Sequence, residues 1–197
     1  MPDAPSDDGR WRGIDELAGL VGTYCWVEDR IFEVTGAWAT GPARAAVDGD
    51  DPALRVWCAA VSRRHGLLAA QWAERLPVRA GVDRGALATA PAGPLAGALA
   101  SLAGTPDIRV GVDTLVLTVF PRLRAIYAMH RRTASPVSEG SVLDVLTAAH
   151  QELTEEIASG RALLQATPER AADEAALGKD LERAFAETSV FPAVSPS

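Results

Sequence analysis

One carboxylate and two imidazoles lie at corresponding places in separate apolar patterns of this chain. Glu28 follows Tyr24 by one helical turn. His65 falls within the apolar stripe of its own segment, and His150 follows Leu146 by one turn. An imidazole can serve as an acid, a base or a metal ligand near neutral pH. Two histidines with one carboxylate are a ligand set of non-haem iron, so these three residues form the candidate site.

The segments that carry these residues are predicted to be helices, because apolar residues recur every three or four positions. Helices are expected over residues 17–38, 52–76, 106–132 and 138–165, with a shorter one over 168–186. A capping residue before proline marks three of the starts, at Asp51-Pro52, Thr105-Pro106 and Thr167-Pro168. Pro121 lies inside the third helix and is expected to kink it.

The lengths of the connections indicate how the helices are ordered. About a dozen residues join the first two helices and about half as many join the third to the fourth, which suits antiparallel neighbours. About thirty residues, 77–105, join the second to the third, with a short helix expected near 95–102. Such a segment can travel back along the second helix. The resulting hairpin, crossover and hairpin resemble the ferritin-like four-helix bundle over residues 14–165; a plain up-down-up-down bundle is the alternative.

This resemblance implies where a metal site would lie. Ferritin-like di-iron proteins place glutamates on four helices, with a Glu-x-x-His pair on the second and fourth. The same helix order would bring Glu28, His65 and His150 to one level, ~16–18 Å above one end of the bundle. Ser62 and Thr147, however, stand where the family has glutamates three residues before each histidine. The resemblance therefore implies a degenerate di-iron site.

Three interpretations of this site remain open. In the first, the site is vestigial, no cofactor binds, Glu28 pairs with Arg122 or a histidine, and the protein is a non-catalytic binding or accessory protein. In the second, Glu28, His65 and His150 hold one non-haem iron or another divalent metal in a small oxidoreductase. In the third, a small-molecule ligand binds in the bundle core without a metal, or is acted on there with His65 or His150 as acid or base. Other residues expected to line the site or orient its groups are Ser62, Thr147, Arg122, Thr118 and Tyr24.

Composition limits the class of protein. A net charge of -7 and a pI near 5.0 argue against nucleic acid and anionic membranes as partners. Cys25 and Cys58 are interpreted as buried apolar residues, in keeping with a cytoplasmic location. We expect one domain over residues 13–187 between disordered tails at 1–12 and 188–197.

The faces of the helices suggest further contacts. Trp26 lies on the back of the first helix, so the crossover, the last helix or a second subunit in a homodimer should cover it. His130 is placed ~15 Å below the other two histidines. The acidic residues of the fourth helix are interpreted as a solvated face; they are Glu152, Glu155 and Glu156.

Overall fold

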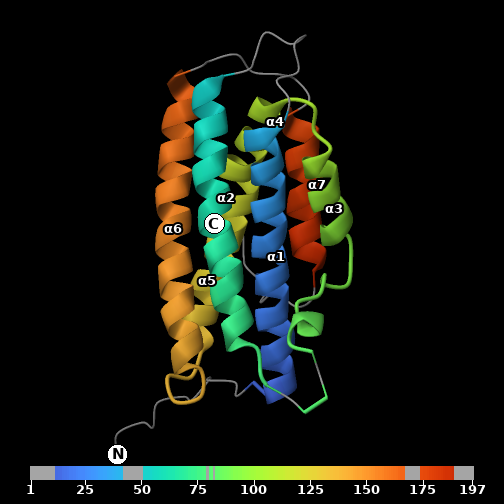
Figure 1. The fold of residues 1–197 in the computed structure, drawn as a ribbon, viewed down its shortest axis with the longest axis vertical. Helices are drawn as coiled ribbons and strands as arrows, with labels where there is room; N and C mark the ends of the chain where they lie inside the picture. Colours follow the sequence, from blue (N-terminus) through green and yellow to red (C-terminus); the bar gives the residue numbers. More distant parts are fainter. Residues whose placement is uncertain (1–11, 42–50, 79, 82, 167–173, 189–197) are drawn as a thin grey trace, which may run out of the picture.

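The computed structural model describes residues 12–41, 51–78, 80–81, 83–166 and 174–188, and within these ranges the chain is all-helical (Figure 1). The elements are α1 (Ile14–Thr40), α2 (Pro52–Arg75), η1 (Gly85–Leu87), α3 (Leu95–Ala103), α4 (Ile108–Thr114), η2 (Leu115–Val119), α5 (Phe120–Thr133), α6 (Gly140–Ala166) and α7 (Glu174–Glu187). The predicted tails lie outside the described residues except at Arg12 and Thr188.

Four long rods form the bundle. In Figure 1, α1 and α2 run antiparallel, and the segment containing α3 leads back toward the end where α2 began. The continuous rod of α4, η2 and α5 then runs in the same direction as α2, and α6 returns antiparallel to it. The last helix, α7, packs with α3 on the outside of the bundle and also contacts α4 and η2. The order of helices is thus hairpin, crossover, hairpin.

Two of the predicted helix starts can be checked. The carboxylate of Asp51 accepts a hydrogen bond from the amide of Ala53 at 2.8 Å, with proline in the first turn, so this cap is confirmed. The start predicted at Thr105-Pro106 is wrong. The amide of Thr105 bonds to the carbonyl of Leu102 at the end of α3, and Asp107 caps α4 instead. The start predicted at Thr167-Pro168 lies outside the described residues.

Pro121 shapes the third rod in a specific way. Proline lacks an amide hydrogen, and its ring crowds the carbonyl four residues earlier. The five residues directly before α5 form the π-helix η2, which accommodates this break within a continuous rod. Gly160 of α6 lies against the same stretch. A methyl group there would overlap Val116 and lie 3.0 Å from the ring of Trp57, so the close approach of α6 needs glycine.

The back of α1 is partly covered by the crossover. Gly22 packs directly against the backbone of Leu87 in η1, where a side chain would not fit. Trp26 is half-buried against the core, with the guanidinium of Arg30 6.0 Å from the centre of its ring. The crossover therefore covers the part of this face around Gly22.

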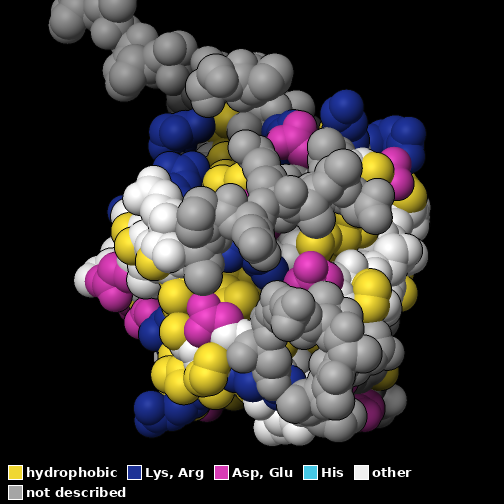
Figure 2. Space-filling view, turned by 90° about the horizontal axis from the view of Figure 1, so that it is seen from above, with side chains coloured by type: hydrophobic (Ala, Val, Ile, Leu, Met, Phe, Trp, Pro, Cys, Tyr) yellow, Lys and Arg dark blue, Asp and Glu magenta, His cyan; other side chains and the backbone are white. Residues whose placement is uncertain are grey.

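The surface is mixed in character. Figure 2 looks onto one end of the bundle and shows side chains of both charges interspersed with hydrophobic ones. Cys25 and Cys58 are buried and free, as expected. Among the helices that the structure describes, none combines the length and the apolarity needed to cross a membrane.

Candidate functional site

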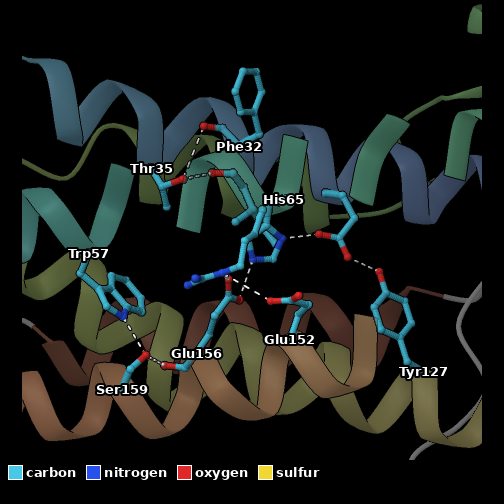
Figure 3. Close-up of polar contacts among 11 residues, drawn as sticks. Phe32, Thr35, Trp57, His65, Tyr127, Glu152, Glu156 and Ser159 are labelled. Atoms are coloured by element: carbon cyan, nitrogen blue, oxygen red, sulfur yellow. Dashed lines mark hydrogen bonds and ion pairs between the residues drawn. The ribbon is translucent and has the colours of Figure 1, made fainter. Parts of the chain in front are cut away.

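The candidate site is centred on His65, whose imidazole lies between two carboxylates in the core (Figure 3). Its Nδ1 atom contacts Oε2 of Glu28 from α1, and its Nε2 atom lies 3.0 Å from Oε2 of Glu156 from α6. Glu28 and His65 are 0% exposed and Glu156 is 1% exposed. Three helices therefore meet at one buried imidazole.

The outer oxygens of both carboxylates are also occupied. The Tyr127 hydroxyl, from α5, donates a hydrogen bond to Oε1 of Glu28. The Arg64 guanidinium donates to Oε1 of Glu156 at 2.7 Å and lies 3.6 Å from Glu152. Arg64 is about one-third exposed, so it connects the buried network to the surface. All four carboxylate oxygens and both ring nitrogens have partners, as buried polar groups require.

The charges in this network favour a protonated imidazole. Burial by itself would lower the pKa of His65, but the negative charges of Glu28 and Glu156 and their hydrogen bonds outweigh it and raise the pKa to about 10. The ring of Phe120 stacks on the imidazole with centroids 5.3 Å apart. His65 is therefore an imidazolium at neutral pH and donates a hydrogen bond to each carboxylate.

A second buried network lies nearer the end of the bundle where α6 begins. The Tyr24 hydroxyl is 3.1 Å from Nδ1 of His130, and Nε2 of His130 is 2.8 Å from Oε2 of Glu139. The guanidinium of Arg12 approaches Glu139 at 3.5 Å. Burial lowers the pKa of His130, so its ring is neutral at pH 7. One tautomer satisfies both contacts: Nε2–H donates to Glu139, and Nδ1 accepts from Tyr24.

The structure brings together two of the three ligands predicted from the sequence. Glu28 and His65 are in direct contact. His150 lies elsewhere: it is half-buried, and its pKa is lowered by burial and by Arg131 and Arg124. Within the described residues no hydrogen bond joins its ring to Glu28 or His65. Glu156 occupies the second nitrogen of His65 instead.

Ser62 and Thr147, both expected near the site, make hydrogen bonds to backbone carbonyls. The hydroxyl of Ser62 donates to the carbonyl of Phe32 on α1 at 2.9 Å and so links α2 to α1. Thr147 is exposed, and its hydroxyl donates to the carbonyl of Leu143 in its own helix. Neither hydroxyl orients the imidazole of His65, whose nitrogens both contact carboxylates.

Two other predicted residues face α7 rather than the site. The guanidinium of Arg122 lies 3.8 Å from the carboxylate of Glu182. The hydroxyl of Thr118 lies so close to Gly178 that an added methyl group there would be 3.2 Å away. The pairing of Arg122 with Glu28 is therefore not formed. Tyr127 and His65 are the partners of Glu28.

Sequence reasoning missed Glu156 and Tyr127. Glu156 is buried, so its assignment to a solvated face is wrong. It follows the buried Leu153 by three residues and precedes the buried Gly160 by four, which places it on the inner stripe of α6. Tyr127 follows the buried Leu123 by one turn. In both cases the spacing from neighbouring apolar residues predicts that the side chain lies on the inner face of its helix.

In the part of the chain that the structure describes, no group of three or more His, Cys, Asp or Glu side chains is arranged to hold a metal ion. Two shallow grooves of about 550 and 690 Å³ flank α2 on the outer surface. No protein-family model, curated protein or solved structure matches this chain.

Proposed function

We propose that this chain is a ferritin-like helical bundle that has lost its di-iron site and acts as a non-catalytic binding or accessory protein. The order of the helices supports the fold assignment, because a hairpin, a crossover and a second hairpin are the arrangement expected of that family. The distribution of carboxylates supports the loss of the site, since α1 and α6 each supply one buried glutamate and α2 supplies a histidine.

The observation that carries the proposal is the imidazolium of His65 between Glu28 and Glu156. A cation bridges two carboxylates here, as a metal would in a di-iron protein. To bind a metal, the ring would have to lose a proton whose pKa is raised to about 10 and give up a charge-assisted hydrogen bond. The donor set therefore fits a proton better than it fits a metal.

Burial of the network favours a structural role over catalysis. A general acid or base must come within hydrogen-bonding distance of its substrate. His65, Glu28 and Tyr127 are all 0% exposed and satisfy one another. The network consequently stabilises the contact among four helices, and binding to a partner is assigned to the outer surfaces of the bundle.

One observation favours a second candidate, a small oxidoreductase with one non-haem metal. Glu28 and His65, two of the three ligands predicted from the sequence, are in direct contact, and a carboxylate and an imidazole are ligands that iron accepts. The nitrogen of His65 that contacts Glu28 becomes available to a metal only if the ring gives up its proton.

Metal analysis of untagged protein, with and without added Fe(II), separates the two functions. The proposal predicts no stoichiometric metal in the wild type. One equivalent of metal that is lost in His65→Ala and kept in His150→Ala would contradict the proposal and support the oxidoreductase. The His150 variant is the matched control, because it removes a half-buried imidazole that does not contact Glu28.

A homodimer through the back of α1 belongs to the same proposal. Trp26 is half-buried, and an aromatic side chain with a cationic neighbour is typical of interface residues. Sedimentation equilibrium of the wild type and Trp26→Ala tests it. A monomeric wild type, or a dimer that persists in the variant, would contradict this interface.

A further inference from the structure

Helix α5 concentrates positive charge in a chain that is acidic as a whole. It has four arginines, one histidine and no carboxylate in the sequence FPRLRAIYAMHRRT, although the net charge of the chain is -7. The helix dipole favours cations in the last turn, which accounts for Arg131 and Arg132. Arg122 pairs with Glu182 of α7 at 3.8 Å. Neither effect explains Arg124, because it lies more than two turns before the end of the helix.

Arg124 and Arg131 form one cationic patch with His150 of α6, the helix that packs beside α5 (Figure 1). The two arginines are seven residues apart, so they share a face of α5 and are separated by ~10.5 Å along its axis. Ala128, which lies between them on this face, has only a methyl group. His150 is half-buried near both arginines, since burial and then the charges of Arg131 and Arg124 lower the pKa of its ring.

Within the described residues no carboxylate balances this patch. Neither guanidinium of the patch makes an ion pair there, and the ring of His150 makes no hydrogen bond there. The neighbours of His150 on its face of α6 are Thr147 and Thr154, which are exposed and donate their hydroxyls to carbonyls of their own helix. Like charges held together without a counter-charge lower stability. Two such cations in an acidic protein therefore indicate a binding site for an anion.

We propose that Arg124, Arg131 and His150 bind a dianionic phosphate group, either free or carried by a small molecule. A phosphate monoester carries about two negative charges at neutral pH and has three strong acceptor oxygens. Two guanidiniums match this charge and donate paired hydrogen bonds to such oxygens. The neutral ring of His150 supplies a further N–H donor. A carboxylate would neutralise only one of the two arginines, so phosphate is the better match.

This inference rests on the proposed binding role, for which it names the class of ligand. Isothermal titration calorimetry of the full chain at neutral pH and low ionic strength tests it, with inorganic phosphate and glycerol phosphate as separate ligands. We expect saturable binding in the millimolar range or tighter. Tighter binding of the ester supports a phosphorylated small molecule, and tighter binding of inorganic phosphate supports the free ion. No saturable binding of either ligand would overturn the proposal.

Single variants locate the bound anion. Arg124→Ala and Arg131→Ala should each weaken binding by about tenfold or more, because each removes a charge-assisted hydrogen bond. Arg132→Ala is the matched control, since it removes the same charge from the next position of α5, where the guanidinium bonds to the sulfur of Met129. Its affinity should stay within about twofold of the wild type. Equal weakening in all three variants would mean general attraction to a basic helix and would contradict a defined site.

Nitrogen-15 nuclear magnetic resonance of the imidazole rings gives an independent measurement on the wild type. Phosphate should shift the ring signals of His150, assigned with His150→Gln, and leave those of the buried His65 and His130 unchanged. Unshifted signals of His150 would count against the proposal. Phosphate binding and metal content are measured separately, so failure of this inference is distinguishable from failure of the proposed function.

Discussion

The stability of the protein should decrease as the pH rises from 7 to 8.5, because the folded state retains a proton that the unfolded state releases. His65 has a pKa raised from 6.5 to about 10 in the folded protein. Its pairing with Glu28 and Glu156 is fully stabilising below pH 6.5 and is lost as the pH rises through about 10. The whole shift corresponds to roughly 5 kcal/mol.

The window from pH 7 to 8.5 isolates this residue. Both other histidines have lowered pKa values, so their effects fall below pH 6.5. The buried thiols have raised pKa values, so theirs begin near pH 9. Across the window the free energy of unfolding should decrease by about 2 kcal/mol, close to the limiting slope of ~1.4 kcal/mol per pH unit for one proton.

Urea denaturation followed by circular dichroism at several pH values measures this slope. The glutamine of His65→Gln does not titrate, so this variant should show no such slope. Its free energy of unfolding should be lower at every pH, because two buried carboxylates lose their cation. A wild-type stability that is constant between pH 7 and 8.5 would refute the assignment of an imidazolium.

Three further predictions concern single contacts, each measured by the denaturation midpoint. Tyr127→Phe removes the hydrogen bond to Glu28 and should cost about 1.5–3 kcal/mol; no loss would mean that the carboxylate finds another donor. Gly160→Ala should cost ~1–3 kcal/mol by overlap with Val116, whereas the control Gly19→Ala, with open space around it, should gain ~0.5–1 kcal/mol; equal effects would contradict the close approach. Asp51→Ala should cost ~1 kcal/mol by removing the cap of α2; an unchanged midpoint would show that the cap contributes nothing.

Much of the helix pattern could be predicted from the sequence. Gly41 follows the last residue of α1, Pro52 begins α2, and the short helix expected at 95–102 is α3, over residues 95–103. These boundaries depend on local residue types, which the sequence displays directly. The start predicted at Thr105 was wrong, because the amide of Thr105 bonds to the end of α3 and Asp107 caps α4 instead.

The site was predicted in part, because residue counts locate a side chain along its own helix better than they align two helices. Glu28 and His65 belong to adjacent helices of one hairpin and meet as expected. The partner from α6 is Glu156, six residues beyond His150. Arg75, the last residue of α2, bonds to the carbonyl of Ser141. Along α2 Arg75 is ~15 Å from His65, whereas along α6 Ser141 is ~22 Å from Glu156. Long side chains such as that of Arg75 bridge this difference in height, so counting residues from the ends of two helices does not align their side chains.

The position of His130 shows the same limitation. It was placed well below the other histidines, and its ring in fact contacts Tyr24, one turn before Glu28 on α1. The long tyrosine side chain reaches toward the lower network, so levels along the axis do not separate the two networks completely. The sequence predicts which residues lie on the inward face of a helix, but it does not predict how far along the bundle axis a long side chain extends.

The most direct test of the account is the protonation state of His65, observed by nitrogen-15 nuclear magnetic resonance of the imidazole rings. The chain has three histidines, and His65→Gln assigns the ring of interest. We expect two slowly exchanging ring N–H protons for His65 at pH 8, unchanged when an equimolar amount of Zn(II) is added. A single ring N–H, or loss of both signals on addition of Zn(II), would contradict the proposal that a proton takes the place of the metal.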